Sequence, residues 1–242
     1  YADGGDKDFA TYDADGERVY VQRMKVEGKY FAFNEKGQMQ TGLQYCKDAN
    51  GFYYFEDNGY QKTGRVSGVE CDDDDYNFYF NTNNGKNGLG TTGEKDGYLY
   101  FNGKRLEADD DYRIYYVSGD LYLVNKKGKI QNSKSGKDFY IENDGIDDIP
   151  NIEKNVDDEY RVVTSGDTIK TVGEVDAAEL IDAIEASLKK ATTDADYAEL
   201  ITDDKGCATV PSIELYDDVY TYSFEKEKGE LSKASAWLEL NK

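Results

Sequence analysis

Aromatic rings are the groups in this sequence that are best placed to bind a ligand, since 22 of the 242 residues are tyrosines. A flat ring can attract a cation or pack against the C–H face of a sugar, while the phenol hydroxyl remains available for hydrogen bonds. The candidate ligand contacts are Tyr30, Phe52, Tyr54, Tyr60, Arg65, Tyr79, Tyr98 and Tyr100. Core packing is the alternative role for each ring, and the sequence leaves that alternative open.

A repeated segment carries most of these residues. Its clearest copy is 51–64, Gly-Phe-Tyr-Tyr-Phe-Glu-Asp-Asn-Gly-Tyr-Gln-Lys-Thr-Gly, and the copy before it is 28–42. Further copies cover 76–81, 97–104, 121–128 and 138–145, with a looser one at 10–16. The last apolar residues of the copies, Tyr12, Phe33, Phe55, Phe80, Phe101, Val124 and Ile141, lie 21, 22, 25, 21, 23 and 17 positions apart. This period predicts a repeat architecture.

Each copy is expected to form a β-hairpin. An aromatic strand is followed by an Asn/Asp-x-x-Gly cluster, which favours a tight turn, and by a short return strand. A two-stranded hairpin is barely stable alone in water, so the copies must stack on one another. The predicted core of this solenoid includes Phe33, Phe55, Phe80 and Phe101.

The repeat pattern resembles the cell-wall-binding repeats of choline-binding and glucan-binding surface proteins, and is similar to the receptor-binding repeats of large clostridial toxins. The resemblance covers roughly 10–145 and is strongest over 28–65, where 37–42 reads Gly-Gln-Met-Gln-Thr-Gly. It implies secretion, a place at the cell wall or cell surface, and a polysaccharide partner.

In choline-binding repeats, the quaternary ammonium lies in a cage of aromatic faces. The resemblance places Tyr30, Phe52 and Tyr98 at the first cage position. The aromatic residue that should follow Thr-Gly is replaced by Leu43 in one copy and by Arg65 in the next. The repeats also contain no tryptophan, so the comparison favours a sugar over choline as the ligand.

Composition narrows the classes of function. The net charge of −21 repels nucleic acid and anionic membranes, and no apolar run is long enough to span a membrane. Histidine is absent, and no nucleophile with a neighbouring base or phosphate-binding loop is found. We therefore expect no enzyme activity, no cofactor and no metal site. Asp13–Gly16 is interpreted as a plain turn, and Asp72–Asp75 as an exposed loop.

The three cysteines are Cys46, Cys71 and Cys207. An odd number without a Cys-x-x-Cys spacing favours free thiols, although a bond between Cys46 and Cys71 stays open. The sequence begins at Tyr1 rather than Met, so we expect it to be a processed or trimmed piece.

A second domain is predicted after a boundary near Ile146. Residues 1–145 form the hairpin repeats, and 151–242 form an acidic α+β domain, so the fold class is mainly β. Strands are expected at 160–164, 169–172 and 219–224, with a further strand at 231–240, and a helical turn at 197–201. The clear helix begins after Asp176, with Glu179 completing a capping box and Val175 packing on Leu180.

Repetition favours binding over catalysis, since several weak sites gain avidity on a polymer. The sequence therefore predicts a non-catalytic, extracellular module that binds cell-wall or other carbohydrate. One alternative is a structural or adhesive spacer whose C-terminal domain binds a surface protein. The other is the accessory region of a larger surface enzyme.

Overall fold

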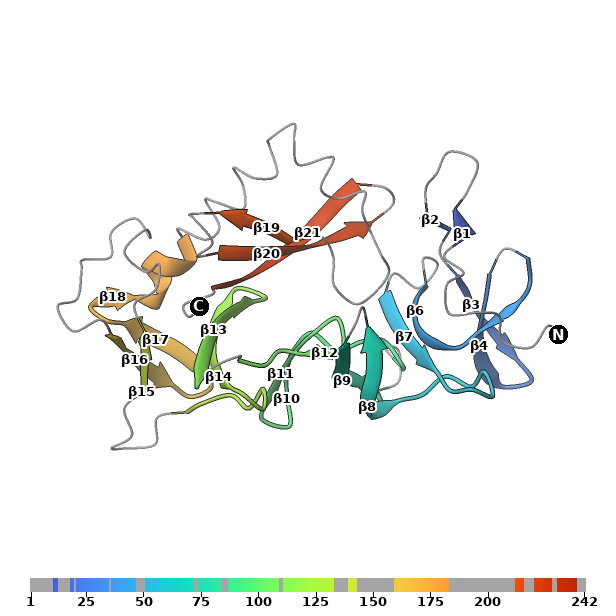
Figure 1. Cartoon of the computed structure of the whole chain (residues 1–242), viewed down its shortest axis with the longest axis horizontal. Coiled ribbons are helices and arrows are strands. Elements are labelled where there is room, and N and C mark those ends of the chain that lie inside the picture. Colours follow the sequence, from blue (N-terminus) through green and yellow to red (C-terminus); the bar gives the residue numbers. More distant parts are fainter. Residues whose placement is uncertain are drawn as a thin grey trace. The chain divides into compact units, whose positions relative to one another are not determined.

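The computed structural model describes residues 11–12, 18–19, 21–34, 36–46, 51–71, 74–83, 87–108, 111–132, 139–142, 159–182, 212–215, 220–227 and 230–238. The fold is mainly β, built from several antiparallel sheets with one short helix in the described part (Figure 1). Two compact units are present. Unit 1 comprises 1–92, 100–105 and 204–210, and unit 2 comprises 93–99, 106–203 and 211–242.

Unit 1 is a succession of antiparallel hairpins in chain order (Figure 1). Its strands are β1 (Thr11–Tyr12), β2 (Arg18–Val19), β3 (Gln22–Val26), β4 (Lys29–Phe33), β5 (Met39–Gln40), β6 (Gly42–Cys46), β7 (Gly51–Phe55), β8 (Gly64–Cys71), β9 (Asp74–Phe80), residues 100–101 of β11 (Tyr98–Phe101), and β12 (Lys104–Arg105). Strand β4 lies between β3 and β5, β6 pairs with β7, and β11, β12, β9 and β8 are bonded in that order. The predicted hairpins of 28–42, 51–64 and 76–81 therefore all contain strands of this unit.

The same turn closes successive hairpins. At Asn34 and Glu56, the main-chain carbonyl accepts a hydrogen bond from the N–H of the glycine three residues later, Gly37 or Gly59. The carbonyl of Asn125 in unit 2 accepts one from Gly128 in the same way. These three glycines have positive φ, a conformation that glycine adopts without a steric penalty. The predicted Asn/Asp-x-x-Gly turn is confirmed.

Main-chain bonds also join each hairpin to the preceding one. The N–H of Gln61 donates to the carbonyl of Tyr30, at 3.0 Å, and the N–H of Gly90 donates to that of Phe52, at 2.8 Å. Within unit 2, the N–H of Ile130 donates to the carbonyl of Gly97, at 2.9 Å. The hairpins are therefore stacked through their backbones, as a repeat architecture requires.

The interior of unit 1 is aromatic. One buried cluster contains Val21, Ala32, Cys46, Tyr53 and Phe55, and a second contains Phe52, Val69, Phe78 and Phe80. Three of the four predicted core phenylalanines, Phe55, Phe80 and Phe101, are buried. Phe33 is only half-buried, so that prediction was wrong for the first hairpin.

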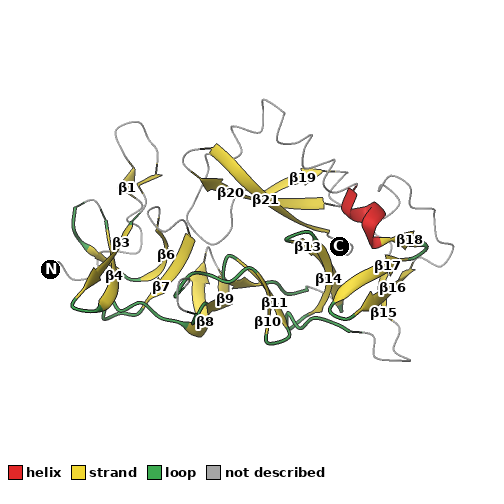
Figure 2. Cartoon of the chain, turned by 180° about the vertical axis from the view of Figure 1, so that it is seen from behind, coloured by secondary structure: helices red, strands yellow, loops and turns green. Residues whose placement is uncertain are grey.

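Unit 2 contains two sheets and the helix. Its strands are β10 (Gly93–Lys95), the first residues of β11, β13 (Tyr112–Val117), β14 (Asp120–Asn125), β15 (Phe139–Glu142), β16 (Glu159–Ser165), β17 (Thr168–Val172), β18 (Val175–Asp176), β19 (Ser212–Leu215), β20 (Tyr220–Glu227) and β21 (Glu230–Leu238). The strand orders are β14-β13-β21-β20-β19 and β15-β16-β17-β18. Viewed from behind, the helix follows β18 (Figure 2).

The strands predicted for 160–164, 169–172, 219–224 and 231–240 correspond to β16, β17, β20 and β21. The helix covers 177–182 in the described part of the chain, directly after Asp176. Leu180 in the helix and Val175 just before it are both buried. The turn at 13–16, the boundary segment near Ile146 and the helical turn at 197–201 lie outside the described residues. The division at 145–151 stays a prediction, although β15, before it, pairs with β16, after it.

Candidate functional site

Successive side chains of β3 point to opposite faces, so its apolar side chains lie on one face and its basic side chains on the other. Gln22, Met24 and Val26 share one face, and Arg23 and Lys25 share the other. Met24 is 49% exposed and Val26 39%, so the first face is open to solvent in this part of the chain.

A surface of apolar and aromatic residues forms where the second hairpin meets this open face. We call it the aromatic surface, and its members are Met24, Lys29, Phe31, Met39 and Tyr60. Met24 lies opposite Phe31 in the β3–β4 pairing. The Tyr60 ring meets the Phe31 ring edge to face, with centroids 5.3 Å apart and planes at 70°. The Nζ of Lys29 lies 5.4 Å from the centroid of the Tyr60 ring.

Gly59 allows the two hairpins to approach. Its φ is +80°, and an added Cβ would lie 2.1 Å from the Sδ of Met39 and 3.0 Å from the Phe31 ring. Tyr60 follows directly and is 41% exposed. The close approach of Gly59 therefore positions the Tyr60 ring beside Phe31 while leaving much of it in water.

The opposite face of the first hairpin holds a cation. The Cζ of Arg23 lies 3.6 Å from the centroid of the Tyr30 ring and 4.6 Å from that of Tyr53. Its Nε donates to the Oε1 of Gln61, and its Nη2 donates to the carbonyl oxygen of Asn87, at 3.1 Å. The half-buried Tyr30 ring is thus covered by a guanidinium from its own hairpin.

Two more of the predicted residues lie beyond this face. Tyr54 is half-buried, with its ring centroid 6.1 Å from that of Phe80. Arg65 is exposed on β8, where its Cα pairs with that of Tyr79. Part of Tyr54 and the Arg65 side chain are therefore accessible to a ligand.

Three predicted rings are buried. Phe52, Tyr79 and Tyr100 are 6%, 8% and 2% exposed, and the rings of Tyr79 and Tyr100 lie 5.8 Å apart. Core packing, the alternative role for these residues, is the one observed. Tyr98 is half-buried in unit 2, where it forms a β-bridge with Lys129.

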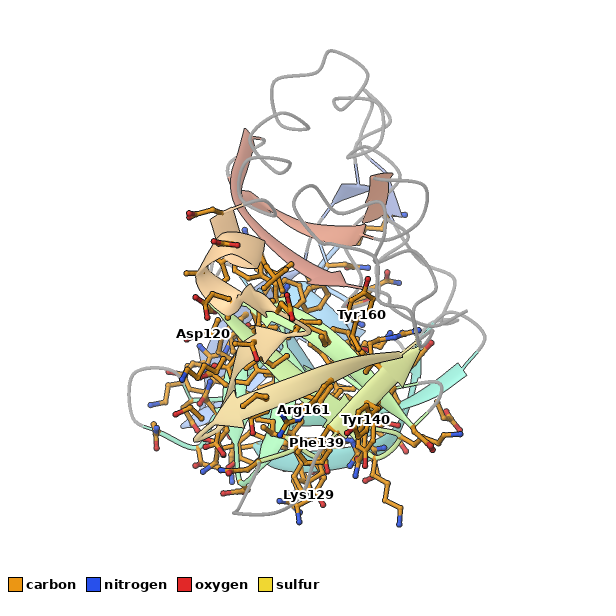
Figure 3. The ribbon with its side chains drawn as sticks, turned by 90° about the vertical axis from the view of Figure 1, so that its left-hand side faces the viewer. Asp120, Lys129, Phe139, Tyr140, Tyr160 and Arg161 are labelled. Atoms are coloured by element: carbon orange, nitrogen blue, oxygen red, sulfur yellow. The ribbon has the colours of Figure 1, made fainter. Side chains whose placement is uncertain are left out.

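Unit 2 exposes one further large aromatic residue. Tyr140 on β15 is 49% exposed and lies opposite Arg161 of β16, with both residues on the outer face of their sheet (Figure 3). Its neighbours Phe139 and Ile141 are buried, as alternation along a strand requires.

Another tyrosine of unit 2 lies among carboxylates. Burial, chiefly, and the nearby Asp120, Asp167 and Glu94 raise the pKa of Tyr122 above 10.0. The neutral phenol is therefore the form that the fold favours.

Sequence reasoning missed Arg23, Lys29, Phe31 and Tyr53 as members of these surfaces. The pairing of Lys25 with Tyr30 makes Arg23 the diagonal neighbour of that ring, within reach of a long side chain. This register could have been inferred from the Glu27-Gly28 turn. The contacts with Tyr53 and Asn87 join residues too distant in sequence for any local pattern to indicate.

Among the described residues, no group of three Asp, Glu or Cys side chains is arranged to hold a metal ion. No helix in that part of the chain has the length and hydropathy to cross a membrane.

No protein-family model and no curated protein matches this chain. Solved structures with partial similarity include choline binding protein F from Streptococcus pneumoniae, at 26% identity over 56% of this chain and 44% of that chain, with a TM-score of 0.32. The same protein, solved in the presence of a peptidoglycan analogue, is 27% identical over 55% of this chain and 42% of that chain, with a TM-score of 0.32. Alternansucrase in complex with isomaltononaose is 17% identical over 51% of this chain and 10% of that chain, with a TM-score of 0.33. The chain thus spans less than half the length of these solved chains.

Proposed function

We propose that this chain is a non-catalytic carbohydrate-binding module that attaches a bacterial surface or secreted protein to a cell-wall or other polysaccharide. The observation that carries the proposal is the Tyr60 ring, exposed beside Phe31 and Lys29 on the aromatic surface. The resemblance of the repeats to cell-wall-binding repeats supports the same ligand class and an extracellular location.

The chemistry of the aromatic surface suits a sugar ring. A pyranose has an apolar C–H face, which the Tyr60 ring and the Met24 side chain can cover, and a rim of hydroxyls. The Nζ of Lys29 and the phenol of Tyr60 can hydrogen-bond that rim. On later strands, Tyr54 is half-buried against Phe80 and Arg65 is exposed, and each offers a separate contact to a longer glycan.

A single platform of this size binds weakly, so the repeats matter. A polymer that also reached the exposed Arg65 or the half-buried Tyr54 would gain affinity from each further weak contact. The proposed ligand is therefore a polysaccharide, and a monosaccharide is expected to compete poorly.

Affinity electrophoresis of the 242-residue chain tests this proposal, with gels that contain cell-wall glycans, α-glucans or β-glucans. Retardation in one glycan is expected, and Tyr60→Ala is expected to weaken the apparent affinity about tenfold, which corresponds to roughly 1.4 kcal/mol. Tyr140→Ala is the matched control, because this tyrosine is as exposed but lies in unit 2.

Free migration in every glycan would overturn the proposal and favour the spacer with a protein partner. Equal losses in the two variants would place the ligand elsewhere than on the aromatic surface. Soluble choline is a competitor in a parallel gel, and relief of retardation by choline would show a cation rather than a sugar to be the ligand.

A further inference from the structure

Groups from three successive hairpins hold the guanidinium of Arg23. The first hairpin supplies Arg23 itself and Tyr30, the second supplies Tyr53 and Gln61, and the third supplies the carbonyl of Asn87. All five residues belong to unit 1. A charged side chain that is half-buried at such a junction has exchanged water for specific partners.

The partners match what a guanidinium binds. Both ring centroids lie inside the limit of about 6 Å at which a cation is attracted to an aromatic face. The Nε and Nη2 of Arg23 donate to separate acceptors, one on Gln61 and one on Asn87. The Nε2 of Gln61 donates to the same Asn87 carbonyl, at 3.2 Å, which fixes the amide in this orientation. Ring faces and acceptors together form a cation site.

Gly88 keeps this arrangement in place. It has a φ of +83°, and an added Cβ would lie 2.1 Å from the Nε2 of Gln61. Any larger residue would push the Gln61 amide away from Arg23. Glycine at position 88 thus leaves the room that the Gln61 amide occupies beside Arg23.

We propose that the rings of Tyr30 and Tyr53 form an organic-cation site that the chain fills with its own Arg23. In this site, Arg23 determines specificity, because it keeps guanidinium and quaternary ammonium compounds out of the module. An external cation would have to displace Arg23 from the hydrogen bonds to Gln61 and Asn87 and from both ring faces before it could enter. The inference does not rest on glycan binding, because its test measures the binding of a cation.

A second tyrosine face in unit 1 is covered in a similar way. The Nζ of Lys104 lies 3.5 Å from the centroid of the Tyr76 ring. The ring faces of Tyr30 and Tyr76 are thus both covered by basic side chains of the same chain. At Tyr60, the Nζ of Lys29 lies farther from the ring centroid, at 5.4 Å, and the residue is 41% exposed.

Removal of Arg23 should open the site to small guanidinium compounds. Arg23→Ala would leave two ring faces with the Gln61 Oε1 and the Asn87 carbonyl beside them. Methylguanidinium can satisfy the rings and both acceptors. Tetramethylammonium can satisfy only the rings, because it has no N–H donor. We expect methylguanidinium to bind the variant more tightly.

The test is thermal unfolding of the full chain and of Arg23→Ala in millimolar methylguanidinium, tetramethylammonium or sodium chloride at equal ionic strength. A ligand at about ten times its Kd raises the ratio of folded to unfolded protein about tenfold. The expected result is a saturable rise in the melting temperature of Arg23→Ala with methylguanidinium, a smaller rise with tetramethylammonium, and no rise for the wild type. Lys25→Ala removes the other cation near Tyr30, at 5.5 Å from its ring, and should behave as the wild type does.

A second measurement covers the case in which Arg23→Ala does not fold. In the wild type, the Nε–H resonance of Arg23 should be shielded by the two rings and should stay unchanged as choline or methylguanidinium is added. Movement of this resonance on titration would show that external cations enter the site and would overturn the proposal. A folded Arg23→Ala that gains no response to either cation would overturn it as well.

Discussion

The main-chain N–H of Gln61 donates to the carbonyl oxygen of Tyr30, at 3.0 Å, and thereby joins the segment that follows the turn of one hairpin to strand β4 of the hairpin before it. The Gln61 side chain also reaches the guanidinium that covers the Tyr30 ring. Gln61 therefore takes part both in the stacking of the repeats and in the contact that covers the Tyr30 ring.

Gly59→Ala should destabilise unit 1 more than Gly37→Ala does, although the two glycines hold the same place in successive repeats. Both have positive φ, which costs a residue with a Cβ about 1–2 kcal/mol. Only at position 59 does the new Cβ also collide with Met39 and Phe31, whereas at 37 nothing lies within 4 Å. Overpacking adds about 1–3 kcal/mol.

Urea unfolding of the two variants measures this difference. Equal losses of stability would show that the second hairpin does not pack on the first through Gly59.

Thr91→Val should leave stability unchanged or raise it by about 1 kcal/mol, because the buried Oγ1 of Thr91 makes no hydrogen bond in the described structure. Thr92→Val is the matched control. The Oγ1 of Thr92 accepts a bond from the main-chain N–H of Asn102, at 3.0 Å, so its removal should cost about 1–3 kcal/mol.

Unfolding free energies of these two variants provide the measurement. A large loss in Thr91→Val would reveal a partner for that hydroxyl, such as an ordered water.

Asn34→Ala should destabilise the first hairpin by about 1–3 kcal/mol. The Oδ1 of this buried side chain accepts hydrogen bonds from the main-chain N–H groups of Lys36 and Gln38, at 3.0 and 2.9 Å. Truncation leaves both donors without that acceptor. Asn34→Asp retains both acceptor contacts and loses only the bond from Nδ2 to Gln38, so a smaller loss is expected.

Hydrogen exchange of the Lys36 and Gln38 amides is the local readout. Unchanged protection in Asn34→Ala would mean that the side chain does not hold the turn.

Tyr122 should titrate above 10.0, because burial, with Asp120, Asp167 and Glu94 near it, disfavours the phenolate. Its folded-state pKa exceeds its unfolded value, so its contribution to stability is full below pH 10 and is lost as the pH rises through the folded pKa. The stability of the wild type should therefore fall more steeply above pH 10 than that of Tyr122→Phe.

The near-ultraviolet absorbance of tyrosinate, taken as the difference between the wild type and Tyr122→Phe, follows this one group. Asp120→Asn should lower its pKa toward 10.0, since one of the neighbouring charges is removed. A difference titration centred at or below 10.0 in the wild type would contradict the prediction.

The sequence alone determined the local part of the architecture. The turn at Asn34, Gly37 and its later copies follows from side-chain acceptors and positive φ within four residues, so the repeated pattern predicted it. The strands at 160–172 and the start of the helix after Asp176 followed from alternation and capping for the same reason.

Tertiary structure decided which aromatic rings are accessible to solvent and which are buried or covered by a basic side chain. Tyr60 and Tyr100 carry the same side chain in related repeats, yet one is 41% exposed and the other 2%, because burial depends on what a neighbouring hairpin packs against the ring. Arg23 reaches Tyr53 and Asn87 across 30 and 64 positions of sequence. Such contacts depend on the packing between hairpins, which the pattern of any single repeat does not encode.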